Sequence, residues 1–295
     1  SFAVSYLAAG IGGRIPGPAA YTAVAAITCC VFMGGYFIHF LITKGYDSAA
    51  LSARRAPALG ELFRGVAGNS SLAAVLLHDS VRLISFYGIA ASAVYYARIV
   101  LREPAADKRI LLMFYAGTAA GACFSQWLSG RYGVRKATAL SCAACAVLHG
   151  LGYFSGHVFL TMVLLFLAQT CFGIAYGLTS KLYNMCGIYG AWKTGNNAQG
   201  IVMSFSSLAV KLAIAVRGVL ITGVLGLIHY APETALSSSA AQGPIRLLFF
   251  AVFSGVMLLS LIPLAFFHLD DAAVQTMSAE IAARSRGRGE EGQES

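Results

Sequence analysis

Charged residues are scarce in this sequence. Only 11% of the 295 residues are charged, with 21 Lys and Arg against 12 Asp and Glu, whereas a soluble domain carries about 25%. Hydrophobic residues make up 58% of the chain, and the mean hydropathy is +0.70. So little charge cannot cover a water-soluble body of this size. That excludes an ordinary cytosolic enzyme, a disordered regulator and a disulfide scaffold, and leaves a polytopic membrane protein.

Long uncharged runs predict the membrane-spanning helices. A helix needs about 20 apolar residues to cross a hydrocarbon core of about 30 Å. The sequence has seven such runs, at 21–42, 83–100, 110–128, 137–154, 158–180, 201–230 and 247–269. The runs are continuously apolar, which favours helices over the alternating segments of a membrane barrel. Residues 2–11 are apolar but too short to cross, and we interpret them as the end of a partial N-terminal helix.

The distribution of Lys and Arg predicts the orientation. About twice as many of these residues flank one side of the predicted spans as the other, and the richer side faces the cytoplasm. The C-terminus is then cytoplasmic in a multi-pass protein of the inner or plasma membrane. On this interpretation the net charge of +9 is mostly a topology signal, so nucleic-acid binding has little support.

Several smaller features concern packing. Residues 47–68 suit an amphipathic helix on the cytoplasmic surface, and the polar tail is predicted to be disordered. The pairs Gly117–Gly121 and Gly173–Gly177 have the spacing of close helix contacts. Cys142 and Cys145 form a C-x-x-C inside a small-residue helix without a second Cys or His pair, so we interpret them as core residues rather than metal ligands.

Two cations within a predicted span are the best functional pointers. Lys211 and Arg217 lie near the middle of the run 201–230, where a charge is costly. They point about 120° apart on a helix. Ser204, Ser207 and Lys211 share one face and resemble the wall of a wet cavity. The alternative for each cation is a structural charge that pairs with a neighbouring helix.

Carboxylates are missing from the same depth. The nearest is Asp79, which is expected at the mouth of its helix beside Arg82. The partners of the two cations then lie in a part of the protein outside this sequence, or an anionic ligand supplies the charge. The six histidines fall near helix ends, and no catalytic or metal-binding motif occurs, so neither an enzyme nor a resident metal or cofactor is expected.

The stretch 183–211 carries a family resemblance. Tyr189-Gly-Ala-Trp-Lys-Thr-Gly195, then Ala198-Gln-Gly-Ile201 and Ser206-Ser-Leu-Ala-Val-Lys211, resembles the glycoside–pentoside–hexuronide:cation symporters, the melibiose-permease branch of the major facilitator superfamily. The basic stretch 130–136 and the stretch 245–250 agree. Met185, Ile188 and Ala191 depart from the pattern, because the family usually has acids there.

The resemblance implies twelve helices in two halves. It divides the chain into the end of an N-terminal half with helix six (1–43), a cytoplasmic middle loop (44–76), the C-terminal half (77–270) and a tail (271–295). The N-terminal half would be a missing partner. The residues implied for substrate contact are Tyr176, Ser206, Ser207, Val210 and Lys211, with Lys211 also near the coupling cation. The residues implied for the gating loop are Tyr189, Gly190, Trp192, Lys193, Thr194 and Gly195.

These implications give a functional hypothesis with alternatives. The chain is expected to be the C-terminal part of a carrier that moves a sugar or glycoside together with Na⁺ or H⁺ by alternating access. A second hypothesis is a carrier for an anionic sugar, such as a uronide or a sulfonated sugar, that is held by Lys211 and Arg217. A third is a non-transporting or decayed membrane fragment.

Overall fold

The computed structural model describes residues 17–44, 68–103, 106–195, 199–230 and 239–291. In these residues the regular structure is entirely helical. The chain divides into two compact units, Ser1–Pro57 and Ala58–Ser295. The predicted partial helix and most of the predicted amphipathic helix fall outside the described residues.

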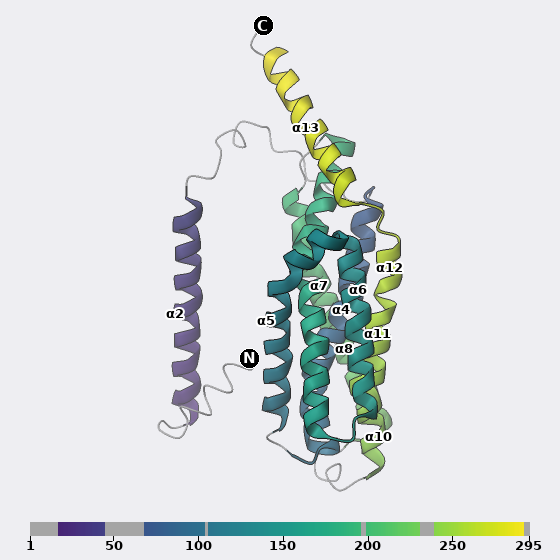
Figure 1. The fold of residues 1–295 in the computed structure, drawn as a ribbon. Coiled ribbons are helices and arrows are strands. Elements are labelled where there is room, and N and C mark those ends of the chain that lie inside the picture. The colour runs from purple at the N-terminus through teal and green to yellow at the C-terminus, as the bar shows by residue number, and fades with distance from the viewer. Residues whose placement is uncertain (1–16, 45–67, 104–105, 196–198, 231–238, 292–295) are drawn as a thin grey trace. The chain divides into compact units, whose positions relative to one another are not determined.

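The first unit contains α2, which spans Gly17–Thr43 (Figure 1). The prediction for this helix was 21–42. Phe32, Phe37 and Ile38 are all exposed within the unit, although they lie on different sides of the helix. A helix that is apolar all round suits lipid or another protein surface and not water.

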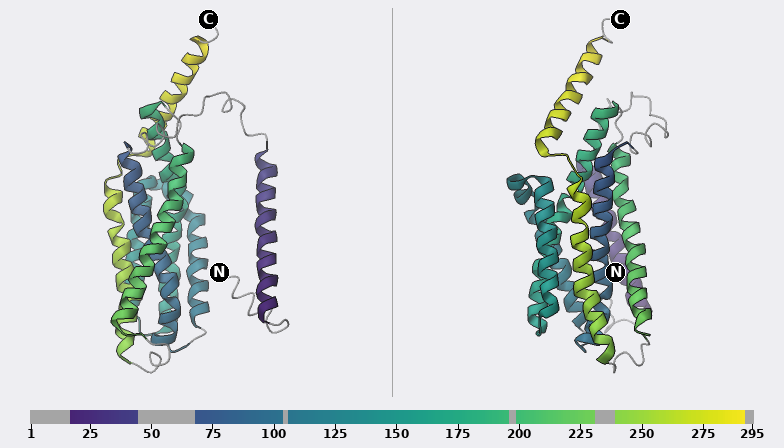
Figure 2. Two further views of the ribbon diagram at one scale, coloured as in Figure 1. Left: turned by 180° about the vertical axis from the view of Figure 1, so that it is seen from behind. Right: turned by 90° about the vertical axis from the view of Figure 1, so that its right-hand side faces the viewer.

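The second unit is a helical bundle whose C-terminal helix extends beyond one end of it (Figures 1 and 2). Its α-helices are α4 (Ser70–Tyr95), α5 (Ala106–Tyr132), α6 (Val134–Leu151), α7 (Val158–Thr194), α8 (Gln199–Leu227), α10 (Gln242–Arg246), α11 (Phe253–Leu259), α12 (Leu261–Ala265) and α13 (Asp271–Glu291). Its short turns are the π-helices η2 (Tyr96–Val100) and η5 (Leu247–Val252) and the 3₁₀ helices η3 (Gly152–Phe154) and η4 (Ser239–Ala241).

Six described helical segments are long and apolar enough to cross a membrane, one fewer than predicted. They are Thr22–Thr43, Ser70–Val100, Val134–Phe154, Val158–Thr194, Gln199–Leu227 and Gln242–Ala265. The seventh prediction, 110–128, lies in α5. This segment is a helix of 27 residues, but its Gly, Ser, Thr and Gln residues lower its hydropathy. The protein is thus a multi-pass membrane protein whose described regular structure is all helical, whereas a count of seven spans plus a partial helix is not confirmed.

Helix α7 packs against α5 along the predicted small residues. A Cβ atom added at Gly121 would overlap the carbonyl oxygen of Thr170, and one added at Gly173 would overlap that of Thr118. Only glycine lets the two backbones approach this closely. The interpretation of these glycines as packing residues is confirmed.

The C-terminal tail differs from its prediction. We expected disorder over 271–295, but residues Asp271–Glu291 form α13. The backbone N–H of Ala273 donates to Asp270 Oδ1, which caps the start of the helix. Val274 is buried, and Met277 packs against the same cluster of apolar side chains as Ile188 of α7. These local caps and contacts offset the polar composition that suggested disorder.

Candidate functional site

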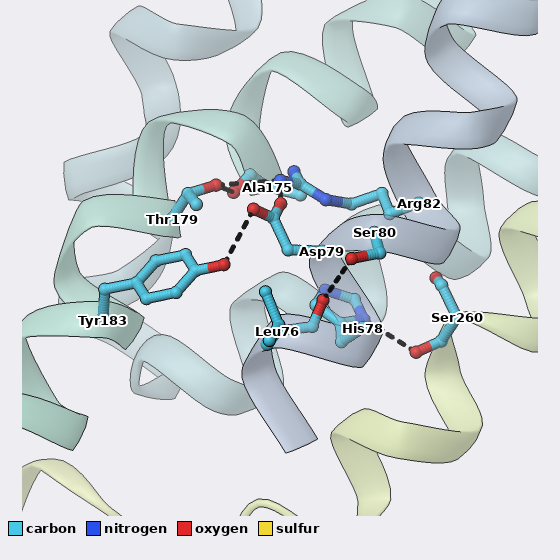
Figure 3. Close-up of polar contacts among 9 residues, drawn as sticks. All are labelled: Leu76, His78, Asp79, Ser80, Arg82, Ala175, Thr179, Tyr183 and Ser260. Atoms are coloured by element: carbon cyan, nitrogen blue, oxygen red, sulfur yellow. Dashed lines mark hydrogen bonds and ion pairs between the residues drawn. The ribbon is translucent and has the colours of Figure 1, made fainter. Parts of the chain in front are cut away.

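A buried ion pair lies inside the bundle (Figure 3). Asp79 and Arg82 occupy adjacent turns of α4, and their side chains form an ion pair. Asp79 is 2% exposed and Arg82 is 1% exposed. Two side chains of α7 complete the network. Tyr183 OH donates to Asp79 Oδ2 at 3.2 Å, and Arg82 Nη2 donates to Thr179 Oγ1 at 2.9 Å.

The position of this pair corrects the sequence interpretation. The predicted span began at residue 83, which put Asp79 at the helix mouth. The helix begins at Ser70 instead, capped by Asn69, whose side chain accepts from the N–H of Leu72 at 3.0 Å. Asp79 is therefore a buried anion inside a span, with its own cation. His78 is buried as well rather than interfacial, and its Nδ1 lies 2.7 Å from the carbonyl oxygen of Ser260.

Arg82 connects the buried pair to an aromatic surface. Its guanidinium carbon lies 5.1 Å from the ring centre of Phe172 and 5.9 Å from that of Tyr176. These two rings are roughly parallel, with centres 6.0 Å apart. Phe172 is fully buried, whereas Tyr176 is 51% exposed. The predicted contact residue Tyr176 therefore presents an open ring with a buried cation beneath it.

Four helices contribute side chains to the surface around Tyr176. The ring centre of Phe86 lies 5.3 Å from that of Tyr87 of α4 and 6.4 Å from that of Tyr115 of α5. Phe86 also stacks on Phe172, the neighbour of Tyr176 on α7. The guanidinium carbon of Arg217 lies 6.0 Å from the ring centre of Tyr87, and its Nη1 donates to the carbonyl oxygen of Tyr87 at 3.0 Å. We call Tyr87, Tyr115, Tyr176 and Arg217 of α8 the tyrosine–arginine face. Arg217 is half-buried, and Tyr115 is exposed.

This face combines two chemistries. The phenol rings offer flat surfaces for stacking and hydroxyl groups that donate and accept hydrogen bonds. Arg217 offers N–H donors with the planar geometry that matches a carboxylate or a sulfonate. The sequence pointed to Tyr176 and Arg217 only. Tyr87 and Tyr115 carry no signal in spacing or motif, because they meet only when α4 and α5 pack beside α7.

The predicted residues of α8 divide into two groups. Ser207 and Lys211 are exposed, as is Ser204, so the face of α8 that they were expected to share is open. Ser206 and Val210 are half-buried, and Val210 packs against the core. Among the described residues no acidic side chain pairs with Lys211. Arg217, unlike Lys211, is half-buried and donates to a backbone carbonyl.

The residues implied for the gating loop are helical. Tyr189, Gly190, Trp192, Lys193 and Thr194 form the last turns of α7, and Gly195 ends the helix with a φ of +72°. A positive φ favours glycine. At 37 residues α7 is about 55 Å long, so these turns extend beyond a hydrocarbon core of about 30 Å.

These last turns of α7 are tied to two other segments. Lys193 Nζ donates to the carbonyl oxygen of Gly68 at 3.3 Å. Trp192 Nε1 donates to Glu280 Oε2 of α13 at 2.7 Å, and Arg284 Nη1 donates to the Trp192 carbonyl at 3.1 Å. Met185, which stands where the family has an acid, packs in the apolar cluster that includes Val274.

The prediction that Cys142 and Cys145 are core residues is confirmed. Cys142 and Cys145 are fully buried in α6 and belong to the core. In the part of the chain that the structure describes, no three His, Cys, Asp or Glu side chains are placed to hold a metal ion.

Comparison with known proteins identifies the family. The sequence profile of the MFS/sugar transport protein family matches residues 1–271. The chain belongs to this family of the major facilitator superfamily, as the resemblance in 183–211 indicated. No solved structure matches the chain.

Two curated relatives come from Escherichia coli (strain K12). A putative 2,3-dihydroxypropane-1-sulfonate exporter is 27% identical over 239 residues, which cover 78% of this chain and 50% of the relative. A glucuronide carrier protein homolog is 24% identical over 263 residues, which cover 88% of this chain and 57% of the relative. The chain thus spans about half the length of the curated relatives it matches.

Proposed function

We propose that this chain is the substrate-binding part of a cation-coupled carrier for a sugar-like molecule that bears an acidic group. The observation that carries the proposal is the tyrosine–arginine face, in which three phenols and one guanidinium from four helices are linked by ring and cation–ring contacts. A hydroxylated ligand would stack on Tyr176, and its acidic group would reach Arg217.

Charge supports an acidic ligand over a neutral one. Arg217 hydrogen-bonds a backbone carbonyl, and Lys211 has no acidic partner among the described residues. Asp79 cannot serve either cation, because Arg82 and Tyr183 occupy it. Both relatives are named for compounds with an acidic group, a sulfonate and a glucuronide. Neutral sugars or glycosides are the second candidate, supported by the open ring of Tyr176.

Transport would proceed by alternating access between two helical halves. The remaining part of the carrier, which corresponds to the unmatched length of the relatives, would close the cavity over the tyrosine–arginine face. Carboxylates of that part would bind the coupling Na⁺ or H⁺, and Lys211 would adjust the site electrostatically. The last turns of α7 would act at the gate, with the C-terminus in the cytoplasm of a cell-membrane protein.

The test replaces Arg217 with Gln in the complete transporter, reconstituted in proteoliposomes. Losing a charge-assisted hydrogen bond should lower kcat/KM for a glucuronide by about 10- to 100-fold, while uptake of an uncharged glucoside changes little. Arg131→Gln, at the exposed end of α5, is the matched control. An equal loss for both substrates would assign Arg217 a structural role, and a wild-type protein that transports neither would refute the proposed function.

A further inference from the structure

Two adjoining cavities lie where α6 begins and α12 ends. One has a volume of about 420 Å³ and is lined mainly by apolar residues, namely Ala139, Leu261, Leu264 and Ala265. The other has a volume of about 310 Å³ and is lined by Tyr132, Gly133 and Leu269 together with the polar side chains of His268, Asp270 and Asp271. Arg135 and Lys136 line both cavities. The two basic side chains therefore lie at the junction between an apolar groove and a polar pocket.

The junction lies at the level of a membrane surface. The candidate span Val134–Phe154 starts one residue before Arg135, and the span Gln242–Ala265 ends at a residue that lines the groove. The apolar cavity thus runs beside two membrane helices, and the polar cavity opens where they leave the hydrocarbon. Exposed apolar side chains at Leu140, Ile262 and Phe266 flank this region.

The order of chemical groups along the two cavities matches that of one kind of lipid. A phospholipid places its acyl chains first, its phosphate next and its headgroup substituent outermost. Here the apolar groove comes first, the two cations stand at the junction, and Asp270 and Asp271 line only the outer pocket. The outer carboxylates would repel an anionic headgroup and attract a cationic one. Pockets with basic residues between membrane helices suit lipid phosphates.

We propose that these cavities bind a phospholipid whose headgroup carries a primary ammonium, of the phosphatidylethanolamine type. Its phosphate would meet Arg135 and Lys136, and its ammonium would donate hydrogen bonds to Asp270 and Asp271. The existing contacts leave room for this. Arg135 Nη2 donates to the Ala265 carbonyl at 2.7 Å, which fixes the guanidinium at the groove wall while the group retains further N–H donors.

The two carboxylates are also positioned in advance. Asp271 Oδ2 accepts from the N–H of Val134 at 3.0 Å, and Asp270 Oδ1 accepts from the N–H of Ala273 at 2.6 Å. A carboxylate has two oxygens and several lone pairs, so each keeps acceptor capacity for an ammonium. A choline headgroup carries no N–H donor and cannot make these bonds.

The experiment measures lipid binding to the purified 295-residue chain by native mass spectrometry. Phosphatidylethanolamine, phosphatidylcholine and phosphatidylglycerol with the same acyl chains compete for the detergent-solubilised protein. We expect the ethanolamine lipid to be retained about tenfold more than either competitor. Lys136→Ala should weaken binding of phospholipids generally, whereas Lys108→Ala, another exposed lysine, should not.

Variants of the outer pocket test the proposed selectivity. Asp270→Asn should remove the preference for ethanolamine over choline, and Asp270→Glu should keep it, since a carboxylate remains. Because Asp270 also caps α13, circular dichroism of each variant checks that the helix persists. Equal retention of the ethanolamine and choline lipids by the unaltered chain, or preferred retention of phosphatidylglycerol, would overturn the proposal. Because the assay involves no transport, its result is independent of the proposed function.

Discussion

Helices α7 and α8 both carry predicted substrate residues, yet they are packed differently. Helix α7 meets α5 through glycines and meets α4 through the Asp79–Arg82 network. Helix α8 packs on α4 but leaves Ser207 and Lys211 exposed, and its Gly218 has open space around it. The difference teaches that a charge inside a membrane helix does not by itself mark a binding site. A charge of this kind points to a binding site only when the protein does not already supply an oppositely charged partner for it.

The largest expected effect comes from breaking the network beside α7. Asp79→Asn leaves Arg82 buried without its counter-charge, which should destabilise the protein by about 3–5 kcal/mol. On α8, Lys211→Gln should change stability by no more than about 0.5 kcal/mol, because its side chain is exposed. Denaturation of the purified proteins in detergent measures both.

A double variant tests the cause of that effect. Asp79→Asn combined with Arg82→Gln removes both charges and should recover most of the lost stability. If the double variant were as unstable as the single one, hydrogen bonds or shape would matter there more than charge.

A smaller effect is expected from the glycine contact of α7 with α5. Gly121→Ala places a methyl group against the Thr170 carbonyl and should cost about 1–3 kcal/mol. Gly218→Ala, on α8, meets nothing within 4 Å and should be neutral or slightly stabilising. Thermal unfolding of the pair checks this, and equal shifts would show that α8 is as tightly packed as α7.

Tyr176 sharpens the comparison because it lies on α7 but is exposed. Tyr176→Ala should leave the thermal midpoint nearly unchanged and lower substrate affinity by about 5- to 10-fold, the value of one aromatic contact. Tyr176→Phe keeps the ring and should lose less. Calorimetry on the complete carrier compares substrate binding by the two variants. A large fall in the thermal midpoint for Tyr176→Ala would show that Tyr176 has a structural role instead.

The smallest effect is expected at the end of α7. Glu280→Gln weakens the hydrogen bond from the half-buried Trp192 of α7 and the exposed ion pair with Arg284 within α13. Such surface contacts contribute about 0–1 kcal/mol. Hydrogen exchange of α13 should rise while that of α7 near Tyr176 stays constant. A faster exchange along the whole of α7 would show that α13 stabilises that helix over its full length.

The sequence predicted the membrane class well, because continuous apolar runs dominate the spans. Its failures share a physical cause. The first turns of α4 were left out of the predicted span because they contain Asp79 and Arg82. These residues form an ion pair that is neutral as a unit, but hydropathy counts them as two charges. Conversely, the run 110–128 was predicted to span the membrane because it carries no charge. Its small and polar residues nevertheless lower the mean hydropathy of α5.

The candidate site was only partly visible in the sequence for a related reason. Lys211 and Arg217 were found because a charge inside an apolar run is conspicuous. Tyr87 and Tyr115 resemble other aromatic residues of membrane helices until the helices are placed side by side. The folding of α13 was missed because its apolar contacts, such as those with the cluster around Ile188, come from residues distant in the sequence.

The hydrogen bond from the N–H of Val134 to Asp271 can form only late in the synthesis of the protein. The two residues are 137 positions apart, so at about 5–20 residues per second the ribosome reaches Asp271 roughly 7–27 s after Val134. Until then the first turn of α6 must satisfy its donors in another way. A truncated product that stops before residue 271 can insert its helices but cannot close this contact. The exposed start of α6 would then distinguish an unfinished chain from a finished one.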